Sequence, residues 1–206
     1  MSKARIAVLV SGGGTNLEAL LNAREAGKIP QGEIVVVLSS SSGAYALERA
    51  KNHGVPGFAV PRKESTQEAF EAGLMEKLTE YQANMIILAG FLSILSEEFV
   101  RRWPDRILNV HPALIPSFCG KGMYGLRVHE AALEKGVKVT GATVHFVNEI
   151  PDGGEILLQK AVEVLPGDTP EVLQRRVMEQ AEWVLLPQAA ELVARGLTHR
   201  KERTVL

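Results

Sequence analysis

An amide and an imidazole stand two residues apart, a spacing that would let both act on one small substrate. Asn109 and His111 lie in the stretch 107–112, where an apolar run ends in a proline. Side chains at positions i and i+2 of a strand point to the same side, so both could reach one ligand. An amide N–H can stabilise a developing oxyanion, and an imidazole can carry a proton near neutral pH. The alternative is a histidine that only closes the strand end with a hydrogen bond.

Asp152 is a carboxylate that could complete this pair. It precedes two glycines in the turn 148–154, where aspartate commonly serves only the turn itself. If the turn folds over the strand end at 107–112, the carboxylate would stabilise a protonated His111 and favour its use as a proton carrier. The sequence does not show that the two groups are close, so both interpretations stay open.

A glycine-rich turn at 11–16 suggests a second site. It reads Ser-Gly-Gly-Gly-Thr-Asn and lies between an apolar run at 6–10 and leucines at helical spacing. Glycines allow backbone amides to approach a ligand, and a helix start attracts anions. A dinucleotide fingerprint would need Gly or Ala where Leu17 stands, and four serines rather than an acid follow the next strand, 33–38. No Gly-Lys-Ser/Thr run is present. We therefore predict a phosphate monoester site, with a purely structural turn as the alternative.

The elements that would position these residues alternate between strand and helix. Apolar runs predict strands at 6–10, 33–38, 57–60, 85–89, 106–110, 138–147 and 155–161, and helical spacing predicts helices between most of them. This order predicts an α/β fold: a single Rossmann-like domain over 1–206, with a mostly parallel twisted sheet and helices on both faces. A long helix is expected from 168 to about 195 with a kink or break at Pro187, followed by a polar tail, 196–206.

Composition narrows the classes of protein further. Of the 206 residues, 46% are hydrophobic and 23% are charged. The net charge of −1 does not indicate a basic surface that would bind nucleic acid or an anionic membrane. The single cysteine, Cys119, excludes an intramolecular disulfide and a cysteine-based zinc site. The first apolar run is too short for a signal peptide or a membrane span. We expect a soluble, cytoplasmic protein that needs no metal.

Several separated motifs occur together in an order that resembles the phosphoribosylglycinamide formyltransferase family. They are Ser11 to Leu17, Leu88 to Phe91, Asn109 to Pro116, Thr140 to Val147, and Asp152 to Gly154. The resemblance spans essentially the whole chain. It implies the formyltransferase form of the Rossmann-like fold. It also implies formyl transfer from 10-formyltetrahydrofolate to the glycine amine of 5′-phosphoribosylglycinamide (GAR) in purine synthesis, by a monomer or a homodimer.

The resemblance also implies roles for individual residues. The catalytic set would be Asn109, His111 and Asp152. GAR would be bound by Gly13, Gly14, Thr15 and Asn16 at its phosphate and by Glu182 near its ribose. The folate would be bound by Phe91, Leu92, Ser93, Ile94 and Leu95, together with Asn109 and Asp152.

The chain departs from the family pattern at three places. Ser93 stands where many members carry arginine, the segment 118–127 is longer than in many members, and the helix with Glu182 matches only after a one-residue shift. The catalytic stretch also resembles formyltetrahydrofolate deformylase and methionyl-tRNA formyltransferase. From another class, a phosphoribosyl-ligand binding module without chemistry is the remaining alternative.

Overall fold

The computed structural model describes residues 3–196, which form two compact units. The first unit comprises the chain up to Leu95 and again from Pro187, and the second comprises Ser96–Leu186. Nearly all of the predicted tail, 196–206, lies outside the described residues. The expectation of one domain over 1–206 stays a prediction.

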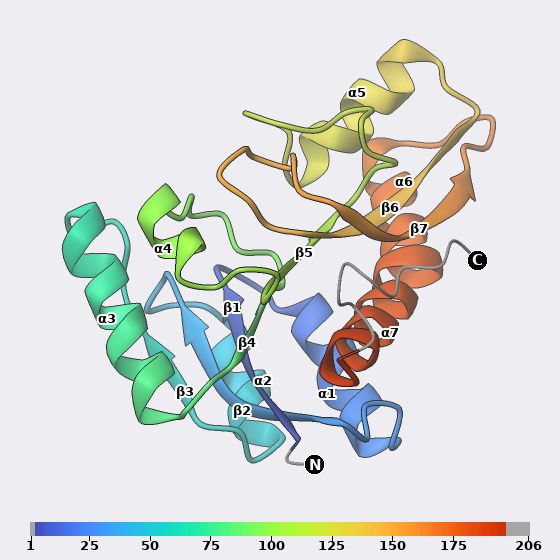
Figure 1. Cartoon of the computed structure of the whole chain (residues 1–206). Coiled ribbons are helices and arrows are strands. Elements are labelled where there is room, and N and C mark those ends of the chain that lie inside the picture. Colours follow the sequence, from blue (N-terminus) through green and yellow to red (C-terminus); the bar gives the residue numbers. More distant parts are fainter. Residues whose placement is uncertain (1–2, 197–206) are drawn as a thin grey trace. The chain divides into compact units, whose positions relative to one another are not determined.

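The first unit is built on four parallel strands in the order β3-β2-β1-β4. Its elements are β1 (Ala4–Val10), α1 (Thr15–Glu25), β2 (Gly32–Ser39), α2 (Ala46–Asn52), β3 (Gly57–Ala59), α3 (Gln67–Glu80) and β4 (Met85–Leu88). The apolar run predicted at 6–10 becomes the buried centre of β1, and its five side chains are fully enclosed. Continuous apolar runs of this kind are typical of parallel strands that are covered on both faces. Helix α1 packs against α2, and α3 lies beside β3, the outer strand of this unit (Figure 1).

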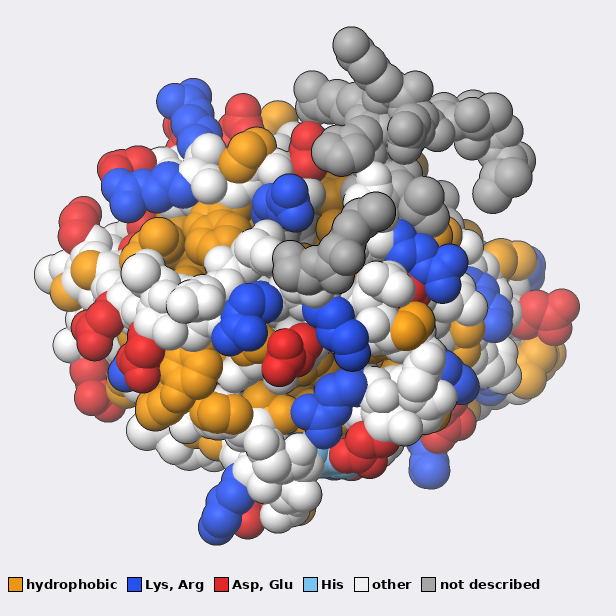
Figure 2. All heavy atoms as spheres, turned by 60° about the horizontal axis from the view of Figure 1, so that its bottom comes forward, with side chains coloured by type: hydrophobic (Ala, Val, Ile, Leu, Met, Phe, Trp, Pro, Cys, Tyr) orange, Lys and Arg blue, Asp and Glu red, His pale blue; other side chains and the backbone are white. Residues whose placement is uncertain are grey.

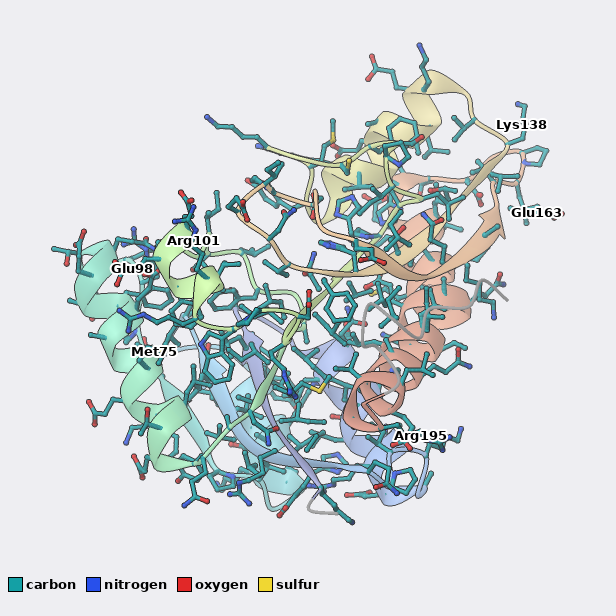
Figure 3. All side chains as sticks on the ribbon, viewed as in Figure 1. Met75, Glu98, Arg101, Lys138, Glu163 and Arg195 are labelled. Atoms are coloured by element: carbon teal, nitrogen blue, oxygen red, sulfur yellow. The ribbon has the colours of Figure 1, made fainter. Side chains whose placement is uncertain are left out.

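The second unit carries three antiparallel strands, β5-β6-β7. Its elements are α4 (Glu97–Arg101), β5 (Ile107–His111), α5 (Leu126–Lys135), β6 (Val139–Phe146), β7 (Ile156–Glu163), α6 (Pro170–Val177) and the π-helix η1 (Met178–Glu182). Helix α7 (Trp183–Ala194) begins in this unit and continues into the first unit. Lys138 directly precedes β6, and Glu163 is the last residue of β7; both lie at the same end of this strand pair (Figure 3). The direct connection between β6 and β7 makes this pair a β-hairpin.

Local hydrogen bonds explain where several helices begin. The hydroxyls of Thr66, Ser96 and Thr169 each accept the backbone N–H three residues later and so cap α3, α4 and α6. The predicted long helix from 168 is present, but it is divided by the π-helix. Pro187 lies inside α7 and does not end it. The irregularity therefore comes before the proline, where the hydrogen bonds of η1 span one residue more than those of an α-helix.

Charged side chains are mixed in sign on the face drawn in Figure 2, where Lys and Arg are interspersed with Asp and Glu. This distribution agrees with the small net charge of the sequence. Within residues 3–196, no helix is long and apolar enough to cross a lipid bilayer.

Ion pairs at His53 join α2 to α1. The Nδ1 atom of His53 lies 2.6 Å from the carboxylate of Glu25, and its Nε2 atom lies 3.2 Å from that of Glu18. The hydrogen bond to Glu25 raises the pKa of His53, and the bond to Glu18 acts in the same direction, against a smaller opposing effect of burial. The charged imidazole therefore stabilises the contact between the two helices.

This raised pKa predicts a pH-dependent part of the stability. The stabilisation is complete below the pKa of the unfolded histidine, about 6.5, and is lost as the pH rises through the higher pKa of the folded state. The difference in unfolding free energy between wild type and His53→Gln should therefore shrink between about pH 6 and about pH 9. Urea unfolding of both proteins at the two pH values measures it, and an unchanged difference would contradict the assignment.

Candidate active site

The pairing of β5 with β6 places Asn109 directly opposite His145. The Nδ2 atom of Asn109 lies 3.1 Å from Nε2 of His145 and also donates to Oδ1 of Asp152 at 3.4 Å. His111, two residues further along β5, is almost fully buried. The strand end at 107–112 and the turn at 148–154 therefore meet, as the catalytic interpretation requires.

Asp152 lies between two imidazoles. Its Oδ2 is 3.6 Å from Nδ1 of His111, and its Oδ1 is 3.6 Å from Nε2 of His145. The backbone N–H of Gly120 donates to Oδ2 at 2.8 Å. One carboxylate thus contacts both histidines and the loop that follows β5. The sequence left open whether His111 and Asp152 are close. The distance of 3.6 Å between them is therefore the main information that the structure adds to the site.

The surroundings of Asp152 keep its carboxyl ionised. Burial by itself would raise the pKa, but His145, the Gly120 N–H and the charge of His111 outweigh it and hold the pKa of Asp152 below its usual value. Burial and the nearby His111 lower the pKa of His129 to about 4, so this enclosed imidazole is neutral at pH 7. Asp152, in the turn 148–154, is therefore the negatively charged group of this site, and His129 does not balance its charge.

Both nitrogens of His111 face hydrogen-bond acceptors. Nε2 lies 2.8 Å from the carbonyl oxygen of Phe118, and a carbonyl can only accept, so Nε2 carries a hydrogen. Nδ1 faces the carboxylate of Asp152. The ring of His111 is therefore held between the loop that follows β5 and the turn that carries Asp152.

The turn that carries Asp152 is held by its own residues. The side chain of Asn148 accepts from the N–H of Ile150 at 3.0 Å and donates to the carbonyl of Gly153 at 3.2 Å. Asp152 itself has a φ of 54°, a left-handed backbone conformation that is strained for residues other than glycine. Gly154 passes so close to β6 that an added Cβ would lie 1.6 Å from the carbonyl oxygen of Phe146.

Substitution of Gly154 should therefore displace the turn. Gly154→Ala cannot be accommodated without moving the backbone of β6 or of the turn, and we expect a loss of at least ~2 kcal/mol of stability. Thermal unfolding measures the loss. The control is Gly167→Ala, at a left-handed position with open space around it, where only the φ preference is violated. If Gly154→Ala is no less stable than the control, the close approach is not important.

The glycine turn 11–16 lies in the first unit, directly after β1. Gly14 has a φ of 75° and is the N-cap residue of α1, so the predicted order of strand, turn and helix is confirmed. Thr15 and Asn16 form the first residues of that helix. A Cβ on Gly13 would meet nothing within 4 Å, so this part of the turn has open space beside it.

The segment 91–95 also belongs to the first unit. Phe91 stacks on Phe70 with ring centroids 6.3 Å apart, whereas Leu92 and Ile94 are 62% and 69% exposed. Exposed apolar side chains next to one anchored ring offer a surface for a flat ligand. Leu92 and Ser93 also line a cavity of about 630 Å³ together with Ser11, the serines at 40–42 and the loop 61–64.

Glu182 is buried at the end of the π-helix η1, which packs against β6 and β7. A π-helical turn takes up one residue more than an α-helical turn. The structure places Glu182 in the same unit as Asn109, His111 and Asp152.

His145 is a site residue whose position the sequence alone does not show. It lies on an alternating strand, and the residue opposite it is known only from the register of β5 and β6. The backbone groups of Phe118 and Gly120 carried no sequence signal beyond their place in a long loop after β5. Among residues 3–196, no three His, Cys, Asp or Glu side chains are grouped so that they could hold a metal ion.

Comparison with known proteins gives consistent results. The family model described as "Formyl transferase" matches residues 4–189. The crystal structure of glycinamide ribonucleotide transformylase 1 from Symbiobacterium toebii has 42% identity and a TM-score of 0.87, over 94% of this chain and 89% of that one. The phosphoribosylglycinamide formyltransferase from Brucella melitensis has 39% identity and a TM-score of 0.85, over 96% and 99%. These matches confirm the predicted Rossmann-like formyltransferase fold.

Some relatives are much longer. The "Trifunctional purine biosynthetic protein adenosine-3" of Gallus gallus is 44% identical over 95% of this chain, but the match spans 19% of that protein. The chloroplastic phosphoribosylglycinamide formyltransferase of Arabidopsis thaliana is 39% identical over 85% of this chain and 61% of that protein. The chain thus corresponds to 14% to 19% of the length of the trifunctional relatives.

Proposed function

The chain belongs to the formyl transferase family, and we propose that it transfers a formyl group from 10-formyltetrahydrofolate to the glycine amine of GAR, giving formyl-GAR for purine synthesis. The observation that supports this most directly is the cluster of Asn109, His111 and Asp152 in one site. The similarity to the Symbiobacterium toebii transformylase over nearly the full length of both chains supports the choice of acceptor.

The proposed roles follow from the charges and donors of the site. Attack of the amine on the formyl carbon places negative charge on the formyl oxygen. Asn109 donates a hydrogen bond to that oxygen, and His111 as imidazolium assists it. Asp152 keeps His111 charged and relays the proton that leaves the amine, with water as the carrier. The folate nitrogen takes up a proton as its bond to the formyl carbon breaks, and tetrahydrofolate leaves. These three side chains supply the acid, the base and the oxyanion donor without a metal ion.

The substrate-binding roles are those that the family resemblance implies. Gly13, Gly14, Thr15 and Asn16 bind the phosphate of GAR through backbone amides and the start of α1. Glu182 binds near the ribose. The folate ring system packs on the apolar segment 91–95 and is bound by Asn109 and Asp152. Leu92 and Ile94 fit a flat ring because their side chains are largely exposed, and Ser93 brings no positive charge to the folate.

The same proposal covers the cellular setting. We infer that the protein works in the cytoplasm on small molecules, as a monomer or a homodimer, without nucleic acid or a membrane partner. The small net charge of −1 supports the exclusion of a nucleic acid partner, because duplex binding generally needs a basic surface.

One assay tests the proposed acceptor. The protein is incubated with 10-formyltetrahydrofolate and, in separate reactions, GAR, methionyl-tRNA or buffer alone, and the formylated products are separated by chromatography. We expect formyl-GAR as the main product. Formate release at the same rate without GAR would identify a deformylase, and formyl-methionyl-tRNA would identify the tRNA enzyme. Binding of GAR without any turnover would indicate a binding module.

A further inference from the structure

Helix α2 holds the glycine turn of the first unit at three successive residues. The backbone N–H of Ala46 donates to the carbonyl of Gly12 at 3.1 Å, and Nε of Arg49 donates to the carbonyl of Gly13 at 2.8 Å. At Gly14, an added Cβ would lie 2.6 Å from the Cβ of Ala46, so the backbone of the turn is in direct contact with the helix. We call these contacts of α2 with residues 12–14 the α2 clamp.

The clamp determines where the amides of the turn point. In a trans peptide the C=O of one residue and the N–H of the next are antiparallel. When α2 binds the carbonyls of Gly12 and Gly13, the N–H groups of Gly13 and Gly14 must point away from α2. Consecutive amides that point to the same side at a helix start form an anion site. The clamp therefore presets the donors that the phosphate needs.

Arg49 is itself fixed in place. Its NH1 atom donates to Oε2 of Glu18 on α1 at 2.9 Å, and its guanidinium carbon lies 5.1 Å from the centroid of the Tyr45 ring. Glu18 is oriented in turn by Nε2 of His53. The guanidinium is planar, so Nε can reach the Gly13 carbonyl while NH1 is bonded to Glu18. A lysine could not make both bonds in this geometry.

We propose that Arg49 is a positioning residue for the phosphate subsite, which it controls through the carbonyl of Gly13. This inference rests on the proposed function, because it assumes that the turn binds the phosphate of GAR. Arg49 does not need to touch the substrate. Its effect is to reduce the reorganisation of the turn when phosphate binds, and its loss should therefore weaken GAR binding while the chemical step is preserved.

The test compares Arg49→Met, Arg49→Lys and Glu18→Gln with Arg24→Met as the matched control. Arg24 has the same exposed fraction as Arg49, 26%, and also bonds a carboxylate and a backbone carbonyl, but at His53 rather than at the turn. We expect Arg49→Met to raise KM for GAR about tenfold, with kcat and KM for 10-formyltetrahydrofolate nearly unchanged. Lysine should not rescue the defect, and Glu18→Gln should reproduce it in weaker form.

Inorganic phosphate gives a readout that does not depend on turnover. Phosphate should raise the melting temperature of the wild type and of Arg24→Met, and should raise that of Arg49→Met much less. If Arg49→Met keeps the wild-type KM for GAR, or if Arg24→Met raises KM equally, the positioning role is wrong. If the wild type does not formylate GAR, the proposed function fails, and the phosphate shifts then decide separately whether Arg49 positions an anion site.

Discussion

Replacing Asp152 with Asn is expected to lower kcat for formyl transfer by about 10²- to 10⁴-fold, with much smaller changes in KM for either substrate. The neutral amide keeps the shape of the side chain and can still accept from the Gly120 N–H. It loses the negative charge that faces Nδ1 of His111. His111 would then lack the partner that holds it charged, and proton transfer would slow.

Steady-state kinetics with GAR and 10-formyltetrahydrofolate measure this effect. Glu149→Gln is the matched control, since it removes an exposed carboxylate from the same turn and should leave kcat nearly unchanged. His111→Asn should be comparably slow, and the double variant should be little slower than either single variant, because the two groups act as a unit. Near wild-type kcat for Asp152→Asn would remove Asp152 from the mechanism.

Replacing Asn109 with Ala is the second substitution with a large expected effect. It removes the only donor on β5 that is assigned to the oxyanion and should lower kcat by about 10²- to 10³-fold. Since the side chain also donates to Asp152 and faces His145, the turn could shift as well.

The isosteric Asn109→Asp variant separates these two effects. Aspartate keeps the shape but replaces the amide donor with a second negative charge beside Asp152, so kcat should be at least as low as in Asn109→Ala. Circular dichroism and thermal unfolding confirm that both variants are folded. Equal kcat in wild type and Asn109→Ala would show that the amide does not stabilise charge in the transition state.

The parts of the fold that depend on nearby residues could be predicted from the sequence. The strand at 6–10 and the helix observed at Gln67–Glu80 follow from continuous apolar residues and from leucines at helical spacing, and Thr66 caps that helix as its residue type suggests. The turn at 11–16 was recognisable because its glycines follow an apolar run, and Gly14 has a φ of 75°, which favours glycine. The π-helix was not predictable, because its hydrogen bonds depend on how the helix packs against β6 and β7.

The site could be predicted only in part. Asn109 and His111 could be paired because they lie on one strand, and Asp152 entered through the turn motif and the family resemblance. The role of His145 depends on the antiparallel register of β5 and β6, which joins residues 36 positions apart. The contacts of Phe118 and Gly120 come from backbone atoms, and any residue type could in principle make them. Such long-range and main-chain contacts leave no pattern in a single sequence.

The fate of the formyl carbon tests the central claim most directly. The protein is mixed with 10-formyltetrahydrofolate labelled with ¹³C in the formyl group and with GAR, and the labelled products are followed by NMR in a single turnover. We predict that the label appears in the amide of formyl-GAR, in a molar amount equal to the tetrahydrofolate released, and that Asp152→Asn slows this transfer. Label in free formate, or no transfer to GAR by the wild type, would contradict the account.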